Sequence, residues 1–396
     1  MKNNVLVVHG GGPTAVMNAS LYGVIKEAGE HGEIDSVYGA LGGMEGILKE
    51  KLVNLSEIDE GELSKLLHTP GSAIGSSRYP ITDEEYVEMS KIIEKYEICC
   101  LLANGGNGTM DACGRLSQAC IRRGNTRVKV VGIPKTIDND IAITDHAPGY
   151  GSAARYIAGT VREIGEDIKS LPIHVSIVEA LGRNSGWITA ASVLAREKEG
   201  DAPHLIYMPE RVFIEDEFLE DVMKIYNKQG GVVVVASEGL RGKDGKPIVE
   251  PIYKTERAIY YGDVSAHLAN LVVKKLGIKA RSEKPGLAGR ASIAWQSEVD
   301  RCEAQLAGQK ALQYAIQGKS GIMVGFERLE TPDGSYQIGF TEIPVEQVMM
   351  HEKIMPEEFM NARGNDVTEA FVRWCKPLIG EPFVRFTDLK RKVAAP

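Results

Sequence analysis

Short apolar runs that end in glycine recur along the chain and constrain its fold more than any other feature. The runs with the length and β-branched content of buried strands are residues 5–12, 97–106, 128–136, 174–183, 231–239 and 321–328. Segments with helical spacing lie between them, near 83–95, 109–123, 151–169, 215–228, 255–276, 298–317 and 356–377, and a first helix follows Thr14 as its N-cap. This alternation predicts an α/β fold with doubly wound, parallel-rich sheets, which bind ligands at the carboxyl ends of their strands.

Composition and charge exclude several classes of protein. The 396 residues carry a formal net charge of −8, with no basic run and no long apolar stretch, which argues against nucleic-acid and membrane partners. The opening "MKNNVLVVHGGG" is typical of a first strand rather than a signal peptide. The cysteines have no zinc-like spacing, and Cys99 and Cys100 are adjacent. We therefore expect reduced thiols in a cytoplasmic protein.

Two glycine-rich stretches stand at strand ends, ahead of helix-like segments. They are "HGGGPTAVMNA" at 9–19 and "ANGGNGTMDA" at 103–112. Backbone N–H groups in that position, aided by the helix dipole, can cradle phosphate. The first stretch matches neither a Walker loop nor a Rossmann fingerprint, and a tight strand-to-helix turn or an Asn-Gly hairpin would be the structural alternatives. Two such cradles in one sheet suit a ligand with several phosphates.

The stretch "IPKTIDNDIAITDHAPGYGSAARY" at 133–156 is the densest polar segment. Asp138, Asp140 and Asp145 follow a strand directly, and Lys135 and Thr136 precede them. One carboxylate of such a cluster can hold Mg²⁺, while another accepts a proton from an attacking hydroxyl. The pattern indicates phosphoryl transfer, with a solvated acidic turn as the alternative.

Charged residues at later strand ends could contact a phosphate or a substrate oxygen. Arg183 follows a strand at once, in a glycine-containing loop. Glu238, Arg281 and Arg290 give weaker signals, because a lone charged side chain is more often a surface residue.

Together these stretches resemble the phosphofructokinase family, which phosphorylates fructose 6-phosphate at its 1-hydroxyl. The motifs that carry the resemblance are "GGGPTAVMNA", "GSSRY" at 75–79, "PKTIDND" at 134–140 and "EALGRNSGW" at 179–187, within a match from Val5 to about Phe326. The opening and "LLHTPGSAIGSSRY" look most similar to the bacterial pyrophosphate-dependent branch. The family implies two similar Rossmann-like domains with the active site in the cleft between them. Residues 1–150 with about 290–355 would bind the donor, 151–289 the acceptor, and about 356–396 would form a helical tail packed on the body.

The resemblance also implies roles for individual residues. Asp138 would be the general base, Asp140 an acid near Mg²⁺, and Thr136, Lys135 and Arg183 would assist the transfer. The implied donor-binding residues are Gly11, Gly12, Arg78, Gly105, Gly106, Asn107, Gly108 and Thr109. The implied acceptor-binding residues are Thr136, Asp138, Leu181, Gly182, Arg183, Glu238, Arg281, Arg290 and His174. Family members are typically homodimers or homotetramers in which a neighbouring subunit completes the sugar-phosphate site.

The loop at 105–108 departs from the family pattern, which is Gly-Gly-Asp-Gly or Gly-Gly-Asp-Asp. A second acid there would repel the α-phosphate of ATP, at a cost on the order of 4 kcal/mol for charges about 4 Å apart, so Gly108 leaves ATP permitted. Lys135 is typical of pyrophosphate users, and no aromatic residue near 38–46 is placed to stack on adenine. We therefore predict pyrophosphate ahead of ATP as the donor. Asn107 removes one metal carboxylate, which leaves Asp140, the donor phosphates and Asp111 to hold Mg²⁺.

The acceptor motifs depart from the family as well. His174 stands where the family has an arginine, and Leu287 where it has the histidine of His-x-x-Arg. Fructose 6-phosphate is the expected acceptor, with another sugar, sugar phosphate or polyol as the alternative. A catalytically weak sugar-phosphate or nucleotide sensor on the same fold is a second class, favoured by Asn107 and opposed by Asp138. A dehydrogenase is disfavoured because the glycine spacing is wrong.

Overall fold

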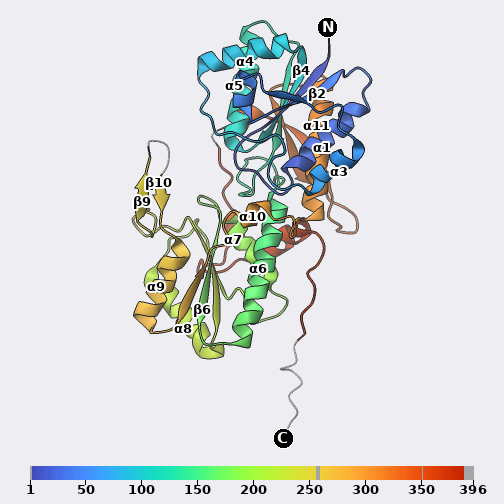
Figure 1. Cartoon of the computed structure of the whole chain (residues 1–396). Helices are drawn as coiled ribbons and strands as arrows, with labels where there is room; N and C mark the ends of the chain where they lie inside the picture. Colours follow the sequence, from blue (N-terminus) through green and yellow to red (C-terminus); the bar gives the residue numbers. More distant parts are fainter. Residues whose placement is uncertain (1, 256–258, 350, 388–396) are drawn as a thin grey trace.

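The computed structural model describes residues 2–255, 259–349 and 351–387, which form two lobes (Figure 1). The strands are β1 (Asn4–His9), β2 (Ser36–Ala40), β3 (Leu52–Asn54), β4 (Ile98–Gly105), β5 (Lys129–Pro134), β6 (Val175–Ala180), β7 (Leu205–Tyr207), β8 (Val232–Ser237), β9 (Pro251–Lys254), β10 (Ile259–Tyr261), β11 (Ala280–Glu283), β12 (Ile322–Arg328) and β13 (Ile338–Pro344). The helices are α1 (Met17–Gly29), α2 (Met44–Leu48), α3 (Glu60–Lys65), α4 (Asp83–Lys95), α5 (Asn107–Arg122), α6 (Tyr150–Ser170), α7 (Trp187–Ala191), α8 (Glu215–Gln229), α9 (Val264–Leu276), α10 (Ala288–Ala291), α11 (Glu298–Ile316) and α12 (Glu369–Cys375). Short 3₁₀ turns are η1 (Leu66–His68), η2 (Ser192–Ala195), η3 (Val345–Gln347), η4 (Glu357–Phe359) and η5 (Lys376–Ile379).

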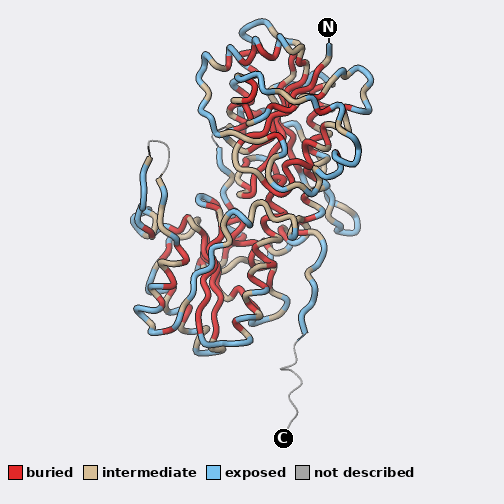
Figure 2. The backbone as a smooth tube through the Cα atoms, viewed as in Figure 1, coloured by how far each residue is buried: buried red, intermediate tan, exposed pale blue. Residues whose placement is uncertain are grey.

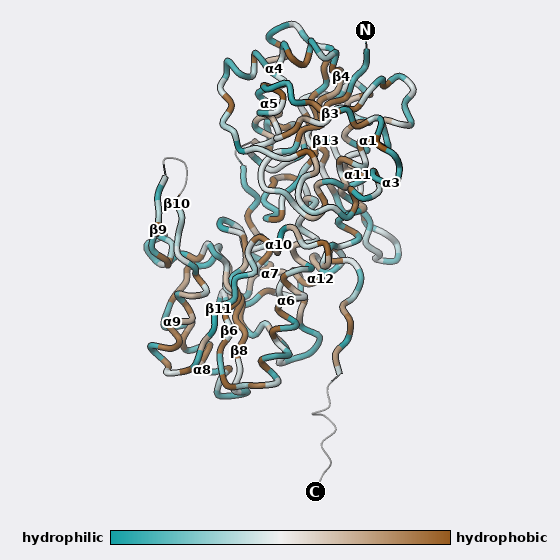
Figure 3. Tube along the Cα trace, viewed as in Figure 1, coloured by the Kyte–Doolittle hydropathy of each residue, from teal (hydrophilic) through white to brown (hydrophobic). Residues whose placement is uncertain are grey.

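The first lobe is built on a seven-stranded sheet in the order β13-β12-β5-β4-β1-β2-β3. Its interior pairs are parallel, and the edge strands β3 and β13 are antiparallel to their neighbours. Successive residues of a strand face opposite sides, so Val7 packs with α1 and α11 while Leu6 packs with α4 and α5. Because both faces are covered, the central strands are buried along most of their length and are mostly apolar, as the sequence runs suggested (Figures 2 and 3).

The second lobe holds a four-stranded parallel sheet in the order β11-β6-β8-β7. Helices α6 and α7 cover one face, and α8 and α9 cover the other. The prediction of an α/β fold with parallel-rich sheets is confirmed. The exact domain division stays a prediction.

The start of α6 is fixed by a buried carboxylate from α11. Asp300 accepts hydrogen bonds from the backbone N–H of Gly149 at 2.8 Å and of Ser152 at 2.9 Å. These are among the N–H groups that a helix leaves without an internal partner. Burial raises the pKa of Asp300 to about 6, although the Ser152 and Gly149 bonds oppose that rise. This contact fixes the end of the acid-rich loop at 135–149.

Three helix predictions are wrong in detail. Helix α9 begins at Val264, because Pro251–Lys254 and Ile259–Tyr261 form the antiparallel β9–β10 pair. Residues 256–258 of the predicted helix lie outside the described residues. The segment 356–377 contains only η4, α12 and the start of η5. Helix α1 begins at Met17 with Val16 as its N-cap, and the hydroxyl of Thr14 instead accepts the N–H of Val16 at 3.3 Å. In the part of the chain that the structure describes, no helix is long and apolar enough to cross a bilayer.

Candidate active site

Three loops meet at the carboxyl edge of the large sheet because β1, β4 and β5 are neighbours there. The N–H of Gly10 donates to the carbonyl of Asn104 at 2.9 Å, and the N–H of Lys135 donates to the carbonyl of Gly105 at 3.0 Å. A β-carbon added to Gly10 or Gly105 would lie 2.2 or 2.1 Å from the hydroxyl oxygen of Thr109. Glycine is therefore required at both positions for α5 to start this close to the β1 loop.

A cavity of about 440 Å³ opens on these loops. Most of the residues predicted to bind the donor line it, and so do four apolar or aromatic side chains that the motifs did not indicate. The lining residues are Gly10, Gly11, Gly12, Met44, Ser77, Arg78, Tyr79, Ile81, Gly106, Asn107, Gly108, Thr109, Ala112, Lys135, Thr136 and Asp140. We call this space the donor cavity. Gly105 is not part of its lining and packs behind it against Thr109.

Lys135 lies at the base of the donor cavity. Its side chain is only 4% exposed, and its Nζ donates to the carbonyl of Gly12 at 2.6 Å. Burial lowers the pKa of Lys135 to about 8, although Asp138 and Asp140 act in the opposite direction. An ammonium that is held dry at a glycine loop is suited to contact a phosphate.

Arg78 and Arg290 approach the same glycine loop as Lys135. A β-carbon added to Gly12 would lie 3.1 Å from Nη1 of Arg290 and 3.6 Å from Nη2 of Arg78. Both arginines contribute to the lowered pKa of Lys135, after the effect of burial. The structure therefore places Arg290, which the sequence assigned to the acceptor, beside the donor loop.

Asp138 lies in a tight turn between the two lobes. Its N–H donates to the hydroxyl of Thr136 at 3.1 Å, and its carbonyl accepts the hydroxyl of Ser185 at 3.0 Å from the second lobe. The next residue, Asn139, adopts φ 51°, a left-handed conformation that asparagine tolerates. Burial, followed by the charges of Asp140 and Glu238, raises the pKa of Asp138 to about 7. A carboxylate with this pKa can both accept and release a proton near neutral pH.

Asn107 and Asp140 form the part of the cavity that suits a metal ion. The amide of Asn107 donates to a carboxylate oxygen of Asp140 at 3.2 Å, and the hydroxyl of Thr136 donates to the other at 2.9 Å. The amide oxygen of Asn107 is buried without a protein partner. Among the described residues no cluster of three His, Cys, Asp or Glu side chains could hold a metal. The donor set of one carboxylate and one free amide oxygen fits Mg²⁺, which takes few protein ligands and completes its shell with phosphates and water.

Asp111 was expected to help hold Mg²⁺, and Asp145 was expected to belong to an acidic cluster that could do so. Neither residue lines the donor cavity, and each is bonded to another charged or titratable side chain. Asp111 pairs with Arg115 at 3.0 Å and does not line the donor cavity. Asp145 accepts from His146 at 2.8 Å and from Arg328 at 3.0 Å. These bonds hold the pKa of Asp145 well below its usual range, although burial alone would raise it.

The predicted acceptor residues after β6 and β8 lie together. Strands β6 and β8 are parallel neighbours, so Gly182 and Glu238 meet, and the N–H of Gly182 donates to the Glu238 carboxylate at 3.3 Å. A β-carbon on Gly239 would collide with the carbonyl oxygen of Arg183 at 1.8 Å. Leu181 packs into the core of the second lobe, whereas the side chain of Arg183 is exposed. The bond from Ser185 to Asp138 brings this pair of loops to the acid-rich turn.

His174 and Arg281 lie at the other edge of the small sheet. His174 directly precedes β6, and Arg281 pairs with Ser176 near the amino end of that strand. Burial and the charge of Arg281 lower the pKa of His174. Since Arg183 and Glu238 follow the carboxyl ends of β6 and β8, the structure does not bring His174 and Arg281 to them within one chain.

The motifs did not reveal Glu352 and Lys353, which hold the acid-rich loop from outside. Glu352 forms a bridge with Ile141, and the N–H of Lys353 donates to the carbonyl of Asp140 at 2.8 Å. The Nζ of Lys353 donates to the carbonyl of Thr144 at 3.0 Å, and burial lowers the pKa of Lys353 to about 8. No local pattern around 352–353 could have shown this, because the contact depends on where the chain returns after β13.

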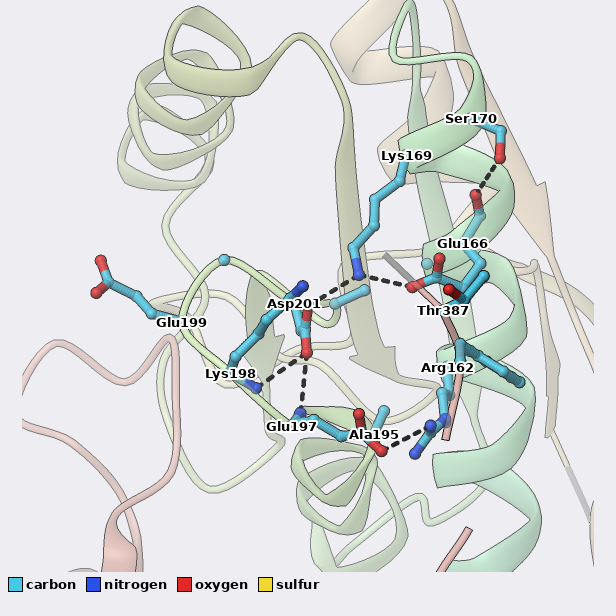
Figure 4. A pocket seen from close by; sticks show the side chains of 14 residues that line it. Arg162, Glu166, Lys169, Ser170, Ala195, Glu197, Lys198, Glu199, Asp201 and Thr387 are labelled. Atoms are coloured by element: carbon cyan, nitrogen blue, oxygen red, sulfur yellow. Dashed lines mark hydrogen bonds and ion pairs between the residues drawn. The ribbon is translucent and has the colours of Figure 1, made fainter. Parts of the chain in front are cut away.

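A second cavity, of about 560 Å³, lies in the small lobe between α6 and the loop at 195–202 (Figure 4). Charged side chains of both signs line this small-lobe cavity and pair with one another. Lys169 lies 2.6 Å from Glu166 and 2.8 Å from Asp201, and Arg162 lies 2.7 Å from Glu197. No residue that the sequence linked to phosphoryl transfer lines it.

Comparison with known proteins identifies the family of this chain. A family model described as phosphofructokinase matches residues 4–315. Pyrophosphate–fructose 6-phosphate 1-phosphotransferase of Rhodospirillum rubrum is 35% identical over 389 residues, which cover 96% of this chain and 95% of that protein. Sulfofructose kinase of Alkalicoccus urumqiensis is 31% identical, with 96% of each chain covered. The crystal structure of a pyrophosphate-dependent phosphofructokinase from Marinobacter aquaeolei matches with a TM-score of 0.87 and 34% identity, over 98% of this chain and 94% of that one. This chain therefore belongs to the phosphofructokinase family.

Proposed function

We propose that this protein transfers a phosphoryl group from pyrophosphate to the 1-hydroxyl of fructose 6-phosphate, giving fructose 1,6-bisphosphate and inorganic phosphate. The near-full-length relatives named for this reaction support the proposal. The observation that carries the choice of donor is Lys135, which lies buried in the donor cavity with its Nζ on the carbonyl of Gly12. The ammonium group of Lys135 lies deep enough in the cavity to contact the second phosphate of the donor. In pyrophosphate, that phosphate is also the last group of the molecule.

Asp138 acts as the general base in this proposal. As the 1-hydroxyl oxygen attacks phosphorus, its proton passes to the Asp138 carboxylate, and the bond between phosphorus and the bridging oxygen of pyrophosphate breaks. The electron pair of that bond leaves with inorganic phosphate. A pKa near 7 matches the base to this task at neutral pH.

Cations and positioned backbone groups stabilise the charge that spreads over the transferred group. Lys135 and Arg78 contact the donor side, and Arg183 approaches from the acceptor side, where Glu238 accepts hydrogen bonds from sugar hydroxyls. Asp140 and the amide oxygen of Asn107 would hold Mg²⁺, which supplies charge neutralisation on the donor phosphates when bound. Phosphoryl transfer depends chiefly on such positioning and electrostatic stabilisation.

A second donor, ATP, is supported by the shape of the donor cavity. A β-carbon on Gly108 would meet nothing within 4 Å, so no side chain closes the space beyond the second phosphate. Met44, Tyr79, Ile81 and Ala112 extend the lining away from the glycine loops. These residues offer an apolar surface to the adenine base of ATP. Pyrophosphate has no base and does not need such a surface.

A second acceptor is supported by the acceptor side of the molecule. His174 stands where the family pattern has an arginine, and Leu287 stands where it has a histidine. One relative is named as a sulfofructose kinase. Sulfofructose carries a sulfonate in place of a phosphate, which places fewer demands on the cations that bind it. A sensor without turnover is disfavoured, because a binding protein has no use for a base with the pKa of Asp138.

The finer features of the proposal follow from the family. We propose a cytoplasmic, Mg²⁺-dependent homodimer or homotetramer that serves carbohydrate metabolism. His174 and Arg281 lie away from the acceptor loops of their own chain, which favours their use at the site of a neighbouring subunit.

The decisive experiment is a matrix of donors against acceptors. Pyrophosphate, ATP and ADP are each combined with fructose 6-phosphate, sulfofructose, free fructose and polyols, with Mg²⁺ present. The proposal expects the highest kcat/KM for pyrophosphate with fructose 6-phosphate. Turnover with ATP and none with pyrophosphate would reject the donor, a higher kcat/KM for another acceptor would reject the sugar, and no turnover in any combination would favour the sensor.

A further inference from the structure

Lys353 holds the acid-rich loop through both its backbone and its side chain. Its N–H donates to the carbonyl of Asp140 at 2.8 Å. Its Nζ donates to the carbonyl of Thr144 at 3.0 Å and also to the carbonyl of Asp145. All three carbonyls belong to the stretch of loop that follows the proposed base, Asp138. One lysine therefore fixes the backbone that carries both the base and the proposed metal ligand.

The ammonium group of Lys353 also lies against two indole rings. Its Nζ is 4.8 Å from the ring centroid of Trp187 and 5.8 Å from that of Trp374. In the parts of the chain that the structure describes, this group pairs with no carboxylate. Removing an ammonium group from water is costly, and carbonyls and aromatic faces offset that cost. An apolar side chain would pack on the indoles without it, so packing alone does not require lysine here.

Trp187 connects this lysine to the acceptor side of the cleft. It begins α7, at the end of the loop at 181–187, which we call the acceptor loop. The same loop carries Arg183, the cation proposed to stabilise the transferred group. The ammonium of Lys353 therefore contacts both the acid-rich loop of the large lobe and the end of the acceptor loop of the small lobe.

The preceding residue, Glu352, makes a second connection between the same two loops. Its backbone forms a bridge with Ile141 of the acid-rich loop. Its exposed carboxylate accepts from the amide of Asn184 at 3.2 and 3.4 Å. Asn184 directly follows Arg183. Two adjacent residues of one returning segment thus hold the loops that carry the proposed base and the proposed acceptor cation.

From these contacts we infer that Glu352 and Lys353 form a clamp that holds the acid-rich loop against the acceptor loop, with Lys353 as a positioning residue. Neither residue lines the donor cavity. The clamp sets the distance between the Asp138 carboxylate, which takes the proton, and the Arg183 guanidinium group. Phosphoryl transfer depends on such alignment, and a misplacement of about 1 Å can cost about 100-fold in rate. This inference rests on the proposed function, because the clamp acts through Asp138 and Arg183.

The kinetic test compares Lys353→Met with Lys169→Met, a loss of charge in the small-lobe cavity. Lys353→Met should lower kcat with pyrophosphate and fructose 6-phosphate by about 10- to 100-fold. Each KM should change by less than about threefold, because the side chains that contact the ligands are retained. Lys169→Met should leave kcat unchanged, even if its thermal unfolding midpoint falls as far. A kcat of Lys353→Met within about twofold of wild type, or an equal loss in both variants, overturns the inference.

A double-mutant cycle tests the connection through Glu352. Glu352→Ala and Asn184→Ala should each lower kcat by about 2- to 10-fold, the effect of one hydrogen bond. The double variant should lose no more than the weaker single variant, because each change breaks the same contact. Losses that multiply in the double variant would show that the two side chains act separately and would overturn this part of the clamp.

Amide hydrogen exchange of the unliganded protein tests the clamp without any substrate. In Lys353→Met, exchange should become faster at residues 138–146 and at the acceptor loop, and stay unchanged in α4. Unchanged exchange in either loop overturns the inference. Glu352→Ala, whose side chain is exposed, provides the same comparison if Lys353→Met does not fold. If wild type has no activity with any donor and acceptor, the proposed function fails independently, and the exchange result alone decides whether the clamp exists.

Discussion

The donor cavity and the small-lobe cavity differ in how their charges are arranged, not in size. Their volumes are about 440 and 560 Å³. In the small lobe, Lys169 pairs with Asp201 and Arg162 pairs with Glu197. In the donor cavity, Lys135 is bonded only to a carbonyl. Neither Arg78, which lines the cavity, nor Arg290, which approaches Gly12, has a pairing carboxylate among the described residues. Paired charges are accounted for by the fold itself, whereas converging unpaired ones indicate an anionic ligand.

The two regions also differ in how they affect an aspartate, as shown by Asp138 near the donor cavity and Asp201 in the small-lobe cavity. Burial raises the pKa of Asp138 to about 7, so its ionisation opposes folding above that pH. This unfavourable effect decreases as pH falls from about 7 toward the ordinary pKa of an aspartate. Burial would also raise the pKa of Asp201, but bonds from Lys169 and from backbone N–H groups hold it below its usual value. Asp201 therefore adds stability above its ordinary pKa, which is lost as pH falls through the folded one. A buried carboxylate whose ionisation opposes folding indicates a catalytic site rather than a structural ion pair.

The largest effect is expected from removing the base. Asp138→Asn should lower kcat with pyrophosphate and fructose 6-phosphate by about 10²- to 10⁴-fold. At pH 8 its thermal unfolding midpoint should equal or exceed that of wild type, because the amide does not carry the buried charge. Steady-state kinetics and calorimetry measure both quantities. A nearly normal kcat, or a clearly less stable variant, would contradict the contrast.

Removing the buried cation should have the next largest effect. Lys135→Met should raise KM for pyrophosphate by about 10- to 100-fold, because a charge-assisted contact to phosphate is lost. KM for fructose 6-phosphate should change far less. Lys169→Met, in the small-lobe cavity, is the matched control and should leave both constants unchanged. An equal rise of both constants in Lys135→Met would show a general structural effect.

The pH dependence of kcat/KM for pyrophosphate should reflect the ionisation of Asp138 and of Lys135. For the free protein, kcat/KM for pyrophosphate should rise as Asp138 loses its proton near pH 7 and fall as Lys135 loses its proton near pH 8. Beyond each limb the change approaches about tenfold per pH unit. Lys135→Met should lose the alkaline limb and keep the acid one. An alkaline limb that persists in this variant would assign it to another group.

A smaller effect is expected at the metal position. Asn107→Asp adds a carboxylate beside Asp140 and should lower the Mg²⁺ concentration for half-maximal activity several-fold. Without metal the two carboxylates repel each other, so the variant should melt below wild type in a chelator and regain stability with Mg²⁺. Activity titrations and thermal shifts measure these effects. Identical Mg²⁺ dependence in both proteins would disagree with the assignment of this corner of the cavity.

The smallest effect on activity is expected in the small lobe. Asp201→Asn should leave kcat and both KM values unchanged. It should lower the free energy of unfolding by about 1 kcal/mol, because the ion pair with Lys169 is lost. Urea denaturation measures this change. A marked loss of activity without a loss of stability would show that this cavity also binds a ligand of the reaction.

The sequence predicted the parts of the fold that depend on local pattern. The buried strands and the helices between them were visible because a strand covered on both faces is apolar throughout, as at Val232–Ser237. The donor loops could be predicted because their glycines directly follow buried strands. Neighbouring parallel strands such as β1 and β4 end at the same edge of the sheet, which brings these glycines together.

Other features depend on where distant segments return, which no local pattern records. The bond from Lys353 to the loop at Asp140 joins residues far apart in the chain. The family resemblance implied an acceptor role for Arg290, and no local pattern showed that the packing of α10 brings its guanidinium group close to Gly12. Asp145 looked like part of an open acidic cluster, yet His146 and Arg328 engage it.

Phosphoryl transfer from pyrophosphate to the sugar can be followed directly, because donor and products all contain phosphorus. The protein is mixed with Mg²⁺, pyrophosphate and fructose 6-phosphate, and the phosphorus species are followed by ³¹P nuclear magnetic resonance. Fructose 1,6-bisphosphate and inorganic phosphate are expected to appear in equal amounts, and both should form at least about 100-fold more slowly when Asp138→Asn replaces the wild type. Inorganic phosphate released without the bisphosphate, or bisphosphate formed equally well by the variant, would contradict this expectation.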